Sequence, residues 1–255
     1  MEIESYLRPI VVGLCLIFGL IFGSFATMLV YRVPNNLNLN KPRSSCDKCK
    51  RQLKWYNLIP IFSYVFQLGK CAKCKKAIGL QSILIEVSMV ASFSLIGLLT
   101  EKWLNLFLLL ILAFGTLVLG VIDLKHPLLP SVIILPLISI GLALGATSDH
   151  KSMLGPVLFG GGLSLFMFAL WFFSGGRGIG FGDVRLAFLT GYIAAFYGVL
   201  VAYFAFVIAL FATVLFIVLY TTLSKTQFRG LKIPFGPTIM LASWLVLLGW
   251  MPVQI

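Results

Sequence analysis

The chain has 255 residues, of which 60% are hydrophobic and 11% are charged, and its mean hydropathy is +1.02. Soluble proteins carry about 25% charged residues, so a soluble domain of this length could not bury so much apolar surface. The composition also excludes disordered and collagen-like chains. The apolar runs are long and continuous, without the period-two alternation of an outer-membrane barrel, so we predict an all-α polytopic membrane protein.

Taken in chain order, the apolar segments predict eight spans: about 9–31, 78–99, 104–122, 131–147, 153–173, two passes within 186–220, and 236–252. The segment Met1–Arg8 has no small-residue cleavage site, so we expect the first span to be retained rather than removed as a signal peptide. The run Leu186–Tyr220 has 35 residues without a charge. One helix of that length would be ~52 Å long against a ~30 Å hydrocarbon core, so it should break near Tyr197-Gly198.

The basic residues predict the orientation, because Lys and Arg accumulate in cytoplasmic loops. With the N-terminus outside the cytoplasm, 17 of the 20 basic residues fall in the four inward loops 32–77, 123–130, 174–185 and 222–234. The net charge of +12 therefore reports topology, and we expect no nucleic-acid partner. The predicted organisation is a first helix (1–31), a cytoplasmic cysteine-rich insert (32–77) and a seven-helix membrane domain (78–255).

Four of the five cysteines lie in the insert, as Cys46-x2-Cys49 and Cys71-x2-Cys74, 21 residues apart. Two such pairs are typical of a tetrahedral zinc site, and four thiolates leave no open position, which favours a structural role. Two disulfides are the alternative, but cytoplasmic thiols stay reduced. Cys15 lies in the first span and is interpreted as a small core residue.

Three acidic residues lie in or at the edge of a span: Glu86, Asp123 and Asp183. Asp123 ends the third span and Asp183 opens the sixth, so both share the cytoplasmic depth. Two carboxyl groups at one depth can share a proton and activate a water, as in aspartic proteases. Two independent residues at helix ends are the alternative. Glu86 is a second candidate site residue, with a buried acid bonded to a neighbouring helix as its alternative.

The loop before Asp183 is rich in glycine, with five glycines among residues 175–182. Glycine allows the backbone to approach a ligand closely, which suits a peptidase that holds its substrate extended. The loop fits neither GxGxxG nor a P-loop, so it does not indicate nucleotide binding.

Gly180-Phe181-Gly182-Asp183 resembles the GxGD signature of intramembrane aspartic proteases, and with Gly178 and Arg185 it is similar to the GMGxGDxK motif of type IV prepilin peptidases. Four further stretches resemble elements of that family: Gly23–Pro34, Cys46–Cys74, Asp123–Pro130 and Pro234–Pro237. The chain departs from the pattern at Thr27, Ser131 and Arg185, where the family commonly has Asn, an acidic residue and Lys. These departures bear on substrate preference rather than on the reaction.

The resemblance implies a bacterial inner-membrane enzyme that cleaves the leader of prepilins or pseudopilins after a glycine, on the cytoplasmic side of the bilayer. It implies Asp123 and Asp183 as catalytic residues, with Gly178, Gly180, Gly182 and Arg185 supporting the substrate. It also implies N-methylation of the new N-terminus by S-adenosylmethionine.

Three other interpretations are open. A transporter would use the three acids as ion sites, although edge positions argue against that. A non-enzymatic zinc-bearing scaffold would depend on the cysteines alone. A protease of the signal-peptide-peptidase or presenilin type would share only the GxGD, and it would leave the cysteine insert unexplained.

Overall fold

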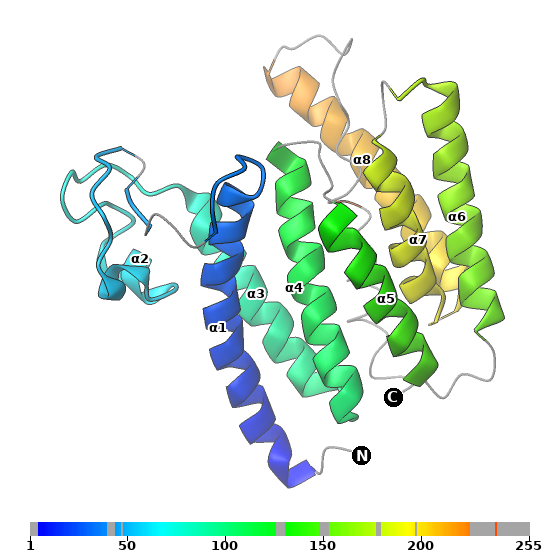
Figure 1. The fold of residues 1–255 in the computed structure, drawn as a ribbon, viewed down its shortest axis with the longest axis horizontal. Coiled ribbons are helices and arrows are strands. Elements are labelled where there is room, and N and C mark those ends of the chain that lie inside the picture. Colours follow the sequence, from blue (N-terminus) through cyan, green and yellow to red (C-terminus); the bar gives the residue numbers. More distant parts are fainter. Residues whose placement is uncertain are drawn as a thin grey trace. The chain divides into compact units, whose positions relative to one another are not determined.

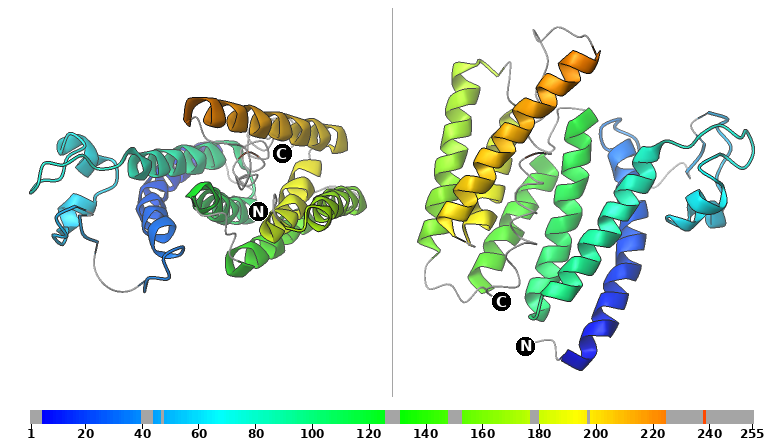
Figure 2. Two further views of the ribbon diagram at one scale, coloured as in Figure 1. Left: turned by 90° about the horizontal axis from the view of Figure 1, so that it is seen from above. Right: turned by 180° about the vertical axis from the view of Figure 1, so that it is seen from behind.

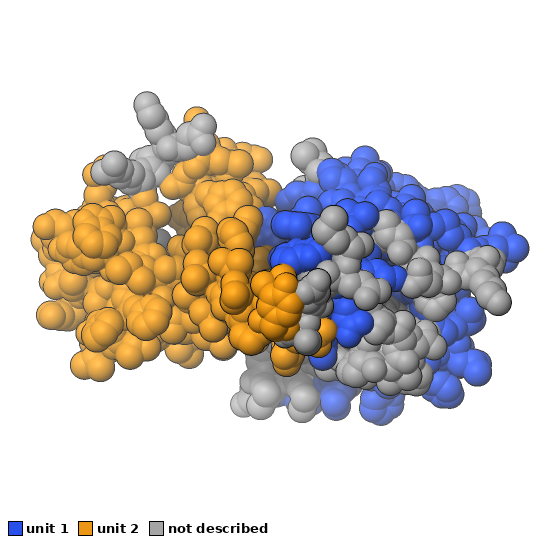
Figure 3. Space-filling model, turned by 90° about the horizontal axis from the view of Figure 1, so that it is seen from below, with its two compact units in different colours: residues 1–2, 99–255 blue, residues 3–98 orange. Residues whose placement is uncertain are grey.

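The structure is a computed structural model that describes residues 5–39, 44–46, 48–125, 131–147, 153–176, 180–196, 198–224 and 238. Over this part of the chain the regular elements are helices, with two isolated β-bridges in the insert. The chain forms two compact units, Ile3–Leu98 and Leu99–Ile255 with Met1–Glu2 (Figure 3).

The unit Ile3–Leu98 is built on two long helices. A short 3-10 helix, η1 (Ser5–Leu7), runs into α1 (Arg8–Arg32), and the insert then leads to α3 (Leu80–Leu99) (Figure 1). Glycines allow α1 and α3 to approach closely, because a Cβ on Gly19 would lie only 2.8 Å from the Cα of Val90. The insert contains two short helices, η2 (Trp55–Leu58) and α2 (Phe62–Phe66).

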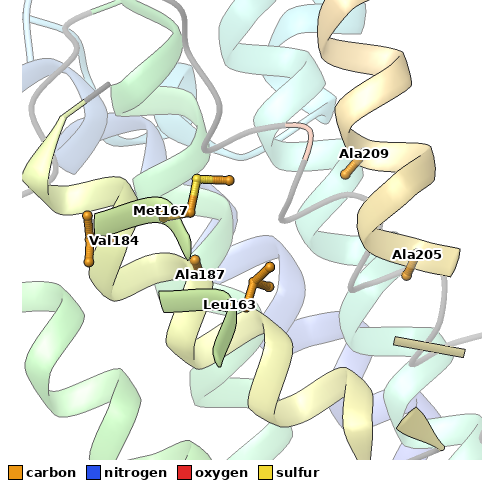
Figure 4. Packing of buried hydrophobic residues seen from close by; sticks show 6 residues of the cluster. All are labelled: Leu163, Met167, Val184, Ala187, Ala205 and Ala209. Carbon is orange, nitrogen blue, oxygen red and sulfur yellow. The ribbon is translucent and has the colours of Figure 1, made fainter. Parts of the chain in front are cut away.

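The second unit contains α4 (Trp103–Lys125), α5 (Ser131–Thr147), α6 (Leu154–Phe173), α7 (Phe181–Ala195) and α8 (Val199–Ser224). Helix α7 contacts α5, α6 and α8, and nearly every residue from Asp183 to Ala195 is buried (Figures 1 and 2). Leu163 and Met167 of α6 pack with residues of α7 and α8 in one buried cluster, completed by Val184, Ala187, Ala205 and Ala209 (Figure 4).

These helices confirm the predicted all-α membrane class. Helices α1, α3, α4 and α6 are long and apolar enough to cross a bilayer, and Ile133–Ala146 and Val199–Leu215 are shorter apolar segments. The predicted break in the long run is also confirmed, because α7 ends at Ala195 and α8 begins at Val199. The last predicted span (236–252), the basic loop at 225–232 and residues 126–130 lie outside the described residues, apart from Thr238.

Candidate active site and metal centre

Asp123 lies in the last turn of α4, two residues before the helix ends at Lys125. Its side chain is only 4% exposed, and it is flanked by the buried residues Leu119 and Ile122. A carboxyl group with so little access to water is costly to keep charged unless other groups stabilise it. Such a position on a span is therefore more typical of a functional residue than of a surface one.

Asp183 is the third residue of α7 and is likewise 4% exposed. Its N–H donates to the carbonyl oxygen of Gly180 at 3.1 Å, and its Oδ2 accepts from the Gly180 N–H at 3.0 Å. This reciprocal pair is the capping arrangement expected at a helix start. The other carboxyl oxygen, Oδ1, is buried and has no hydrogen-bond partner among the described residues. It is therefore available to a substrate or a water.

The two carboxyl groups are within electrostatic range of one another, and the charge of Asp123 acts on the carboxyl group of Asp183. They are carried by the C-terminal end of α4 and the N-terminal end of α7, and α5 packs against both helices. Two buried like charges that act on one another favour a state in which one carboxyl group is protonated. The arrangement can therefore supply one acid and one base.

Helix α6 fixes the beginning of α7. The Ser164 hydroxyl donates to the carbonyl oxygen of Val184 at 2.9 Å, directly beside Asp183. One turn away, a Cβ on Gly160 would lie 2.8 Å from the carbonyl oxygen of Phe188, so the two backbones are in close contact. The sequence analysis missed Ser164, although Gly160-x3-Ser164 is the small-x3-small spacing that marks close helix pairs.

The glycine loop uses two of its glycines to turn the chain. Gly175 and Gly176 have φ of +60° and +70°, and their N–H groups donate to carbonyl oxygens at the end of α6. Residues with a Cβ rarely adopt these angles, so both positions favour glycine for a structural reason. Gly180 has φ of −81°, which any residue adopts. Gly178 lies outside the described residues, and Gly182 lies in the first turn of α7.

Arg185 links the beginnings of α5 and α7. Its guanidinium group lies over the ring of Phe181, 4.9 Å from the centroid, and donates a hydrogen bond to the hydroxyl of Ser131. The same Phe181 ring meets Trp171 edge to face, with centroids 5.3 Å apart. Two of the three departures from the family pattern, Ser131 and Arg185, are thus bonded to one another.

The four insert cysteines form one cluster with free thiols, and their sulfurs all lie within 4.8 Å of one another. The Cys46 and Cys74 sulfurs are 3.9 Å apart. Four sulfurs bound at ~2.3 Å around a tetrahedral zinc are ~3.8 Å apart, so the donor set and its spacing fit zinc. Backbone N–H groups of Cys74 and Lys73 lower the pKa of the Cys71 thiol to about 6, whereas burial and the neighbouring cysteines raise the pKa of the Cys74 thiol to about 11. Without a cation at the centre, the cluster therefore favours a thiolate at Cys71 and a protonated thiol at Cys74.

The two cysteine pairs have the same local geometry. In the first, Cys46 N–H donates to Arg51 O and Lys50 N–H donates to Cys46 O, both at 2.9 Å. In the second, Cys71 N–H donates to Lys76 O and Lys75 N–H donates to Cys71 O, both again at 2.9 Å. The two lysines that close these turns have matching φ values of 57° and 55°. The insert therefore presents two equivalent cysteine turns to one point, where the four sulfurs could hold a metal ion.

Glu86 lies in α3 and holds part of the insert. Its Oε2 accepts a hydrogen bond from the Ile61 N–H at 2.7 Å. Ile61 has φ of +62°, and the Phe62 N–H donates to the Pro60 carbonyl oxygen at 2.6 Å, which makes a γ-turn centred on Ile61. Positive φ is unusual for a β-branched residue, so the Glu86 bond stabilises a strained turn.

Residues 17–100 match the family profile of the bacterial peptidase A24 N-terminal domain, and residues 107–222 match that of the type IV leader peptidase family. A curated relative from Bacillus subtilis, a prepilin leader peptidase/N-methyltransferase, is 30% identical over 91% of this chain and 92% of its own length. The chain belongs to the type IV leader peptidase family.

Other members of the type IV leader peptidase family are similar over comparable lengths. Relatives from Pseudomonas aeruginosa and Neisseria gonorrhoeae, both named prepilin leader peptidase/N-methyltransferase, are each 29% identical to this chain. The alignments cover 97% and 95% of this chain, and 94% and 92% of the relatives. No solved structure matches the chain. The resemblance seen in the motifs is therefore confirmed at the level of the family.

Proposed function

We propose that this leader peptidase cleaves type IV prepilins or pseudopilins after a glycine, with Asp123 and Asp183 as the catalytic pair. The observation that carries the proposal is a pair of buried carboxyl groups within electrostatic reach, one with an unpartnered oxygen. A transporter or a zinc-bearing scaffold would explain neither the interaction of the two buried carboxyl groups nor the membership of a peptidase family.

In the proposed reaction the pair shares one proton and holds a water between its oxygens. The charged carboxylate takes a proton from the water, whose oxygen attacks the scissile carbonyl carbon while the partner acid protonates the carbonyl oxygen. The resulting gem-diol collapses, the C–N bond breaks, and a carboxyl proton passes to the leaving nitrogen. The products are the leader with a new carboxyl terminus and the mature protein with a free amine.

The other candidate residues are proposed to support this chemistry. Gly178, Gly180 and Gly182 let the loop before Asp183 lie along an extended substrate. Arg185 positions the beginning of α7 through its contacts with Ser131 and Phe181. We place the pair at the cytoplasmic face of the bacterial inner membrane, with the N-terminus outside, because this orientation puts 17 of the 20 basic residues on the cytoplasmic side.

The cofactor proposals rest on the insert and on the names of the relatives. A structural zinc would be held by the four insert cysteines, Cys46, Cys49, Cys71 and Cys74. Four thiolates fill the tetrahedral coordination of the ion and leave no position for another ligand. S-adenosylmethionine would serve as the second substrate and give its methyl group to the nitrogen of the new N-terminus. Glu86 is a candidate for the second activity, although its bond to Ile61 supports a structural role.

The test is an incubation of the detergent-purified protein with a synthetic prepilin and S-adenosylmethionine, read by mass spectrometry. Asp123→Asn and Asp183→Asn should each lower cleavage on the order of 10³-fold, because neither amide can act as the acid or base. Both variants keep the size of the side chain, and the temperature at which each unfolds in detergent serves as the folding control. Cleavage that persists in either variant would refute the catalytic pair, and no cleavage by the unchanged protein would favour the transporter or scaffold.

A further inference from the structure

The middle of the insert differs from its ends. Residues Trp55–Leu68 are 14 consecutive residues without a charge, although most of the insert is strongly basic. Trp55 is 78% exposed, and Phe66 and Leu68 are each 83% exposed. Other large apolar side chains of the same segment are also exposed: Tyr56, Leu58, Ile59, Phe62 and Val65. We call these residues the uncharged segment.

Such a surface is not expected in water. Contiguous exposed apolar patches of this kind mark binding or membrane surfaces. An apolar stretch of 10–14 residues is too short to cross a bilayer but is typical of an interfacial or re-entrant segment. Tryptophan and tyrosine, here Trp55 and Tyr56, are the residues enriched at membrane–water interfaces.

The Glu86 bond places this segment at the level of the bilayer. Helix α3 has 20 residues, about the ~30 Å needed to cross the hydrocarbon core. Glu86 lies six residues after Leu80, so its Cα is ~9 Å along the helix from that end. Because Glu86 accepts a hydrogen bond from Ile61, the uncharged segment is held against the first turns of α3, a helix long and apolar enough to cross the bilayer.

The charges around the segment select the kind of lipid. The basic residues that flank it or belong to the cysteine turns are all exposed: Lys48, Lys50, Arg51, Lys54, Lys70, Lys73, Lys75 and Lys76. Basic residues near a membrane surface are attracted to the headgroups of anionic lipids. Anionic lipid headgroups carry the opposite charge, so this surface suits an anionic bilayer.

We propose that the segment Trp55–Leu68 lies in the interface of an anionic bilayer, where it anchors the insert beside α3. The apolar side chains lie at the boundary between headgroups and acyl chains, and the flanking lysines contact lipid phosphates. The anchor keeps the two cysteine turns at the membrane surface. This role is separate from peptide cleavage and from zinc binding.

The test uses the full chain in vesicles of phosphatidylglycerol and phosphatidylethanolamine whose acyl chains carry bromine, a quencher of tryptophan fluorescence. The difference in emission between the unchanged protein and Trp55→Phe reports Trp55 alone, and this substitution keeps an aromatic ring. We expect the Trp55 emission to be lost with brominated acyl chains and to be insensitive to acrylamide in the water. In brominated phosphatidylcholine without anionic lipid, the loss should be smaller.

Each contrary result overturns the proposal. Quenching by acrylamide but not by brominated lipid would place the segment in water. Equal quenching with and without anionic lipid would show that the flanking lysines do not bind anionic headgroups, which contradicts the proposed anionic interface. Relief of lipid quenching by an added synthetic prepilin would assign the surface to the substrate. The quenching measurements themselves need no prepilin. Their result would therefore stand even if the protein did not cleave prepilins.

Discussion

At the scale of single residues, the two aspartates are held by different means. Asp183 is fixed locally, because its Oδ2 and its N–H both bond to Gly180 three residues earlier. Asp123 depends on the end of α4, where neighbouring core residues bury it. The sequence places both residues at span edges, and the packing of α4 and α7 against α5 brings the two carboxyl groups within electrostatic range.

Glu86 gives a prediction at the same scale. Glu86→Ala removes the acceptor of the Ile61 N–H, and an unpaired buried amide costs ~1–3 kcal/mol. Amide hydrogen exchange in residues 55–68 should therefore become faster by roughly one order of magnitude. Glu86→Gln keeps a carbonyl oxygen in the same place and should leave exchange nearly unchanged. Equal exchange in both variants would show that the bond does not hold the insert.

At the scale of helices, the pairing of α6 with α7 positions the catalytic residue proposed at Asp183. Gly160 and Ser164 of α6 contact the α7 backbone, and Gly191 of α7 faces Gly160. In lipid the hydrophobic effect does not drive helices together, so close backbone contact and interhelical hydrogen bonds must do so. Small residues at these positions are therefore required by the packing.

Neighbouring glycines in α6 allow a matched test. In Gly160→Ala the new methyl group would lie 2.8 Å from the Phe188 carbonyl oxygen, whereas at Gly161 a Cβ meets nothing within 4 Å. Forcing an extra carbon into a packed contact costs ~1–3 kcal/mol, so Gly160→Ala should lower thermal stability and slow prepilin cleavage. Gly161→Ala should leave both close to the unchanged protein. Similar losses in the two variants would contradict this account of the interface.

At the scale of the whole molecule, the two candidate sites fall in different compact units. Ile3–Leu98 contains all four insert cysteines, and Leu99–Ile255 contains both aspartates. The two family profiles, residues 17–100 and 107–222, follow nearly the same division. Loss of one site need not abolish the chemistry of the other.

This division predicts separable effects. Cys46→Ser should lower bound zinc, measured by mass spectrometry of metals, while peptide cleavage falls by less than in Asp123→Asn or Asp183→Asn. Cys15→Ser is the control, because Cys15 packs in α1 away from the cluster and should leave the zinc content unchanged. Loss of cleavage equal to that of the aspartate variants would mean that the proposed catalytic pair depends on the insert.

The sequence alone determined the helical class, the approximate bounds of the long helices α1 and α3 to α8, and the cysteine cluster. Hydropathy and length decide spans because a bilayer leaves little choice of secondary structure, and repeated CxxC spacing brings sulfurs together locally. The break near Gly198 followed from length alone.

Only the tertiary structure decided contacts between segments distant in the chain. The bond from Ser164 to Val184, the contact of Arg185 with Ser131, and the γ-turn held by Glu86 have no local signal strong enough to predict them. In each case a polar group finds its partner through helix packing, which depends on shape and close approach across the fold. The interaction of Asp123 with Asp183 belongs to the same class: the sequence predicts that both residues lie at span edges, and the arrangement of α4, α5 and α7 brings them within electrostatic range.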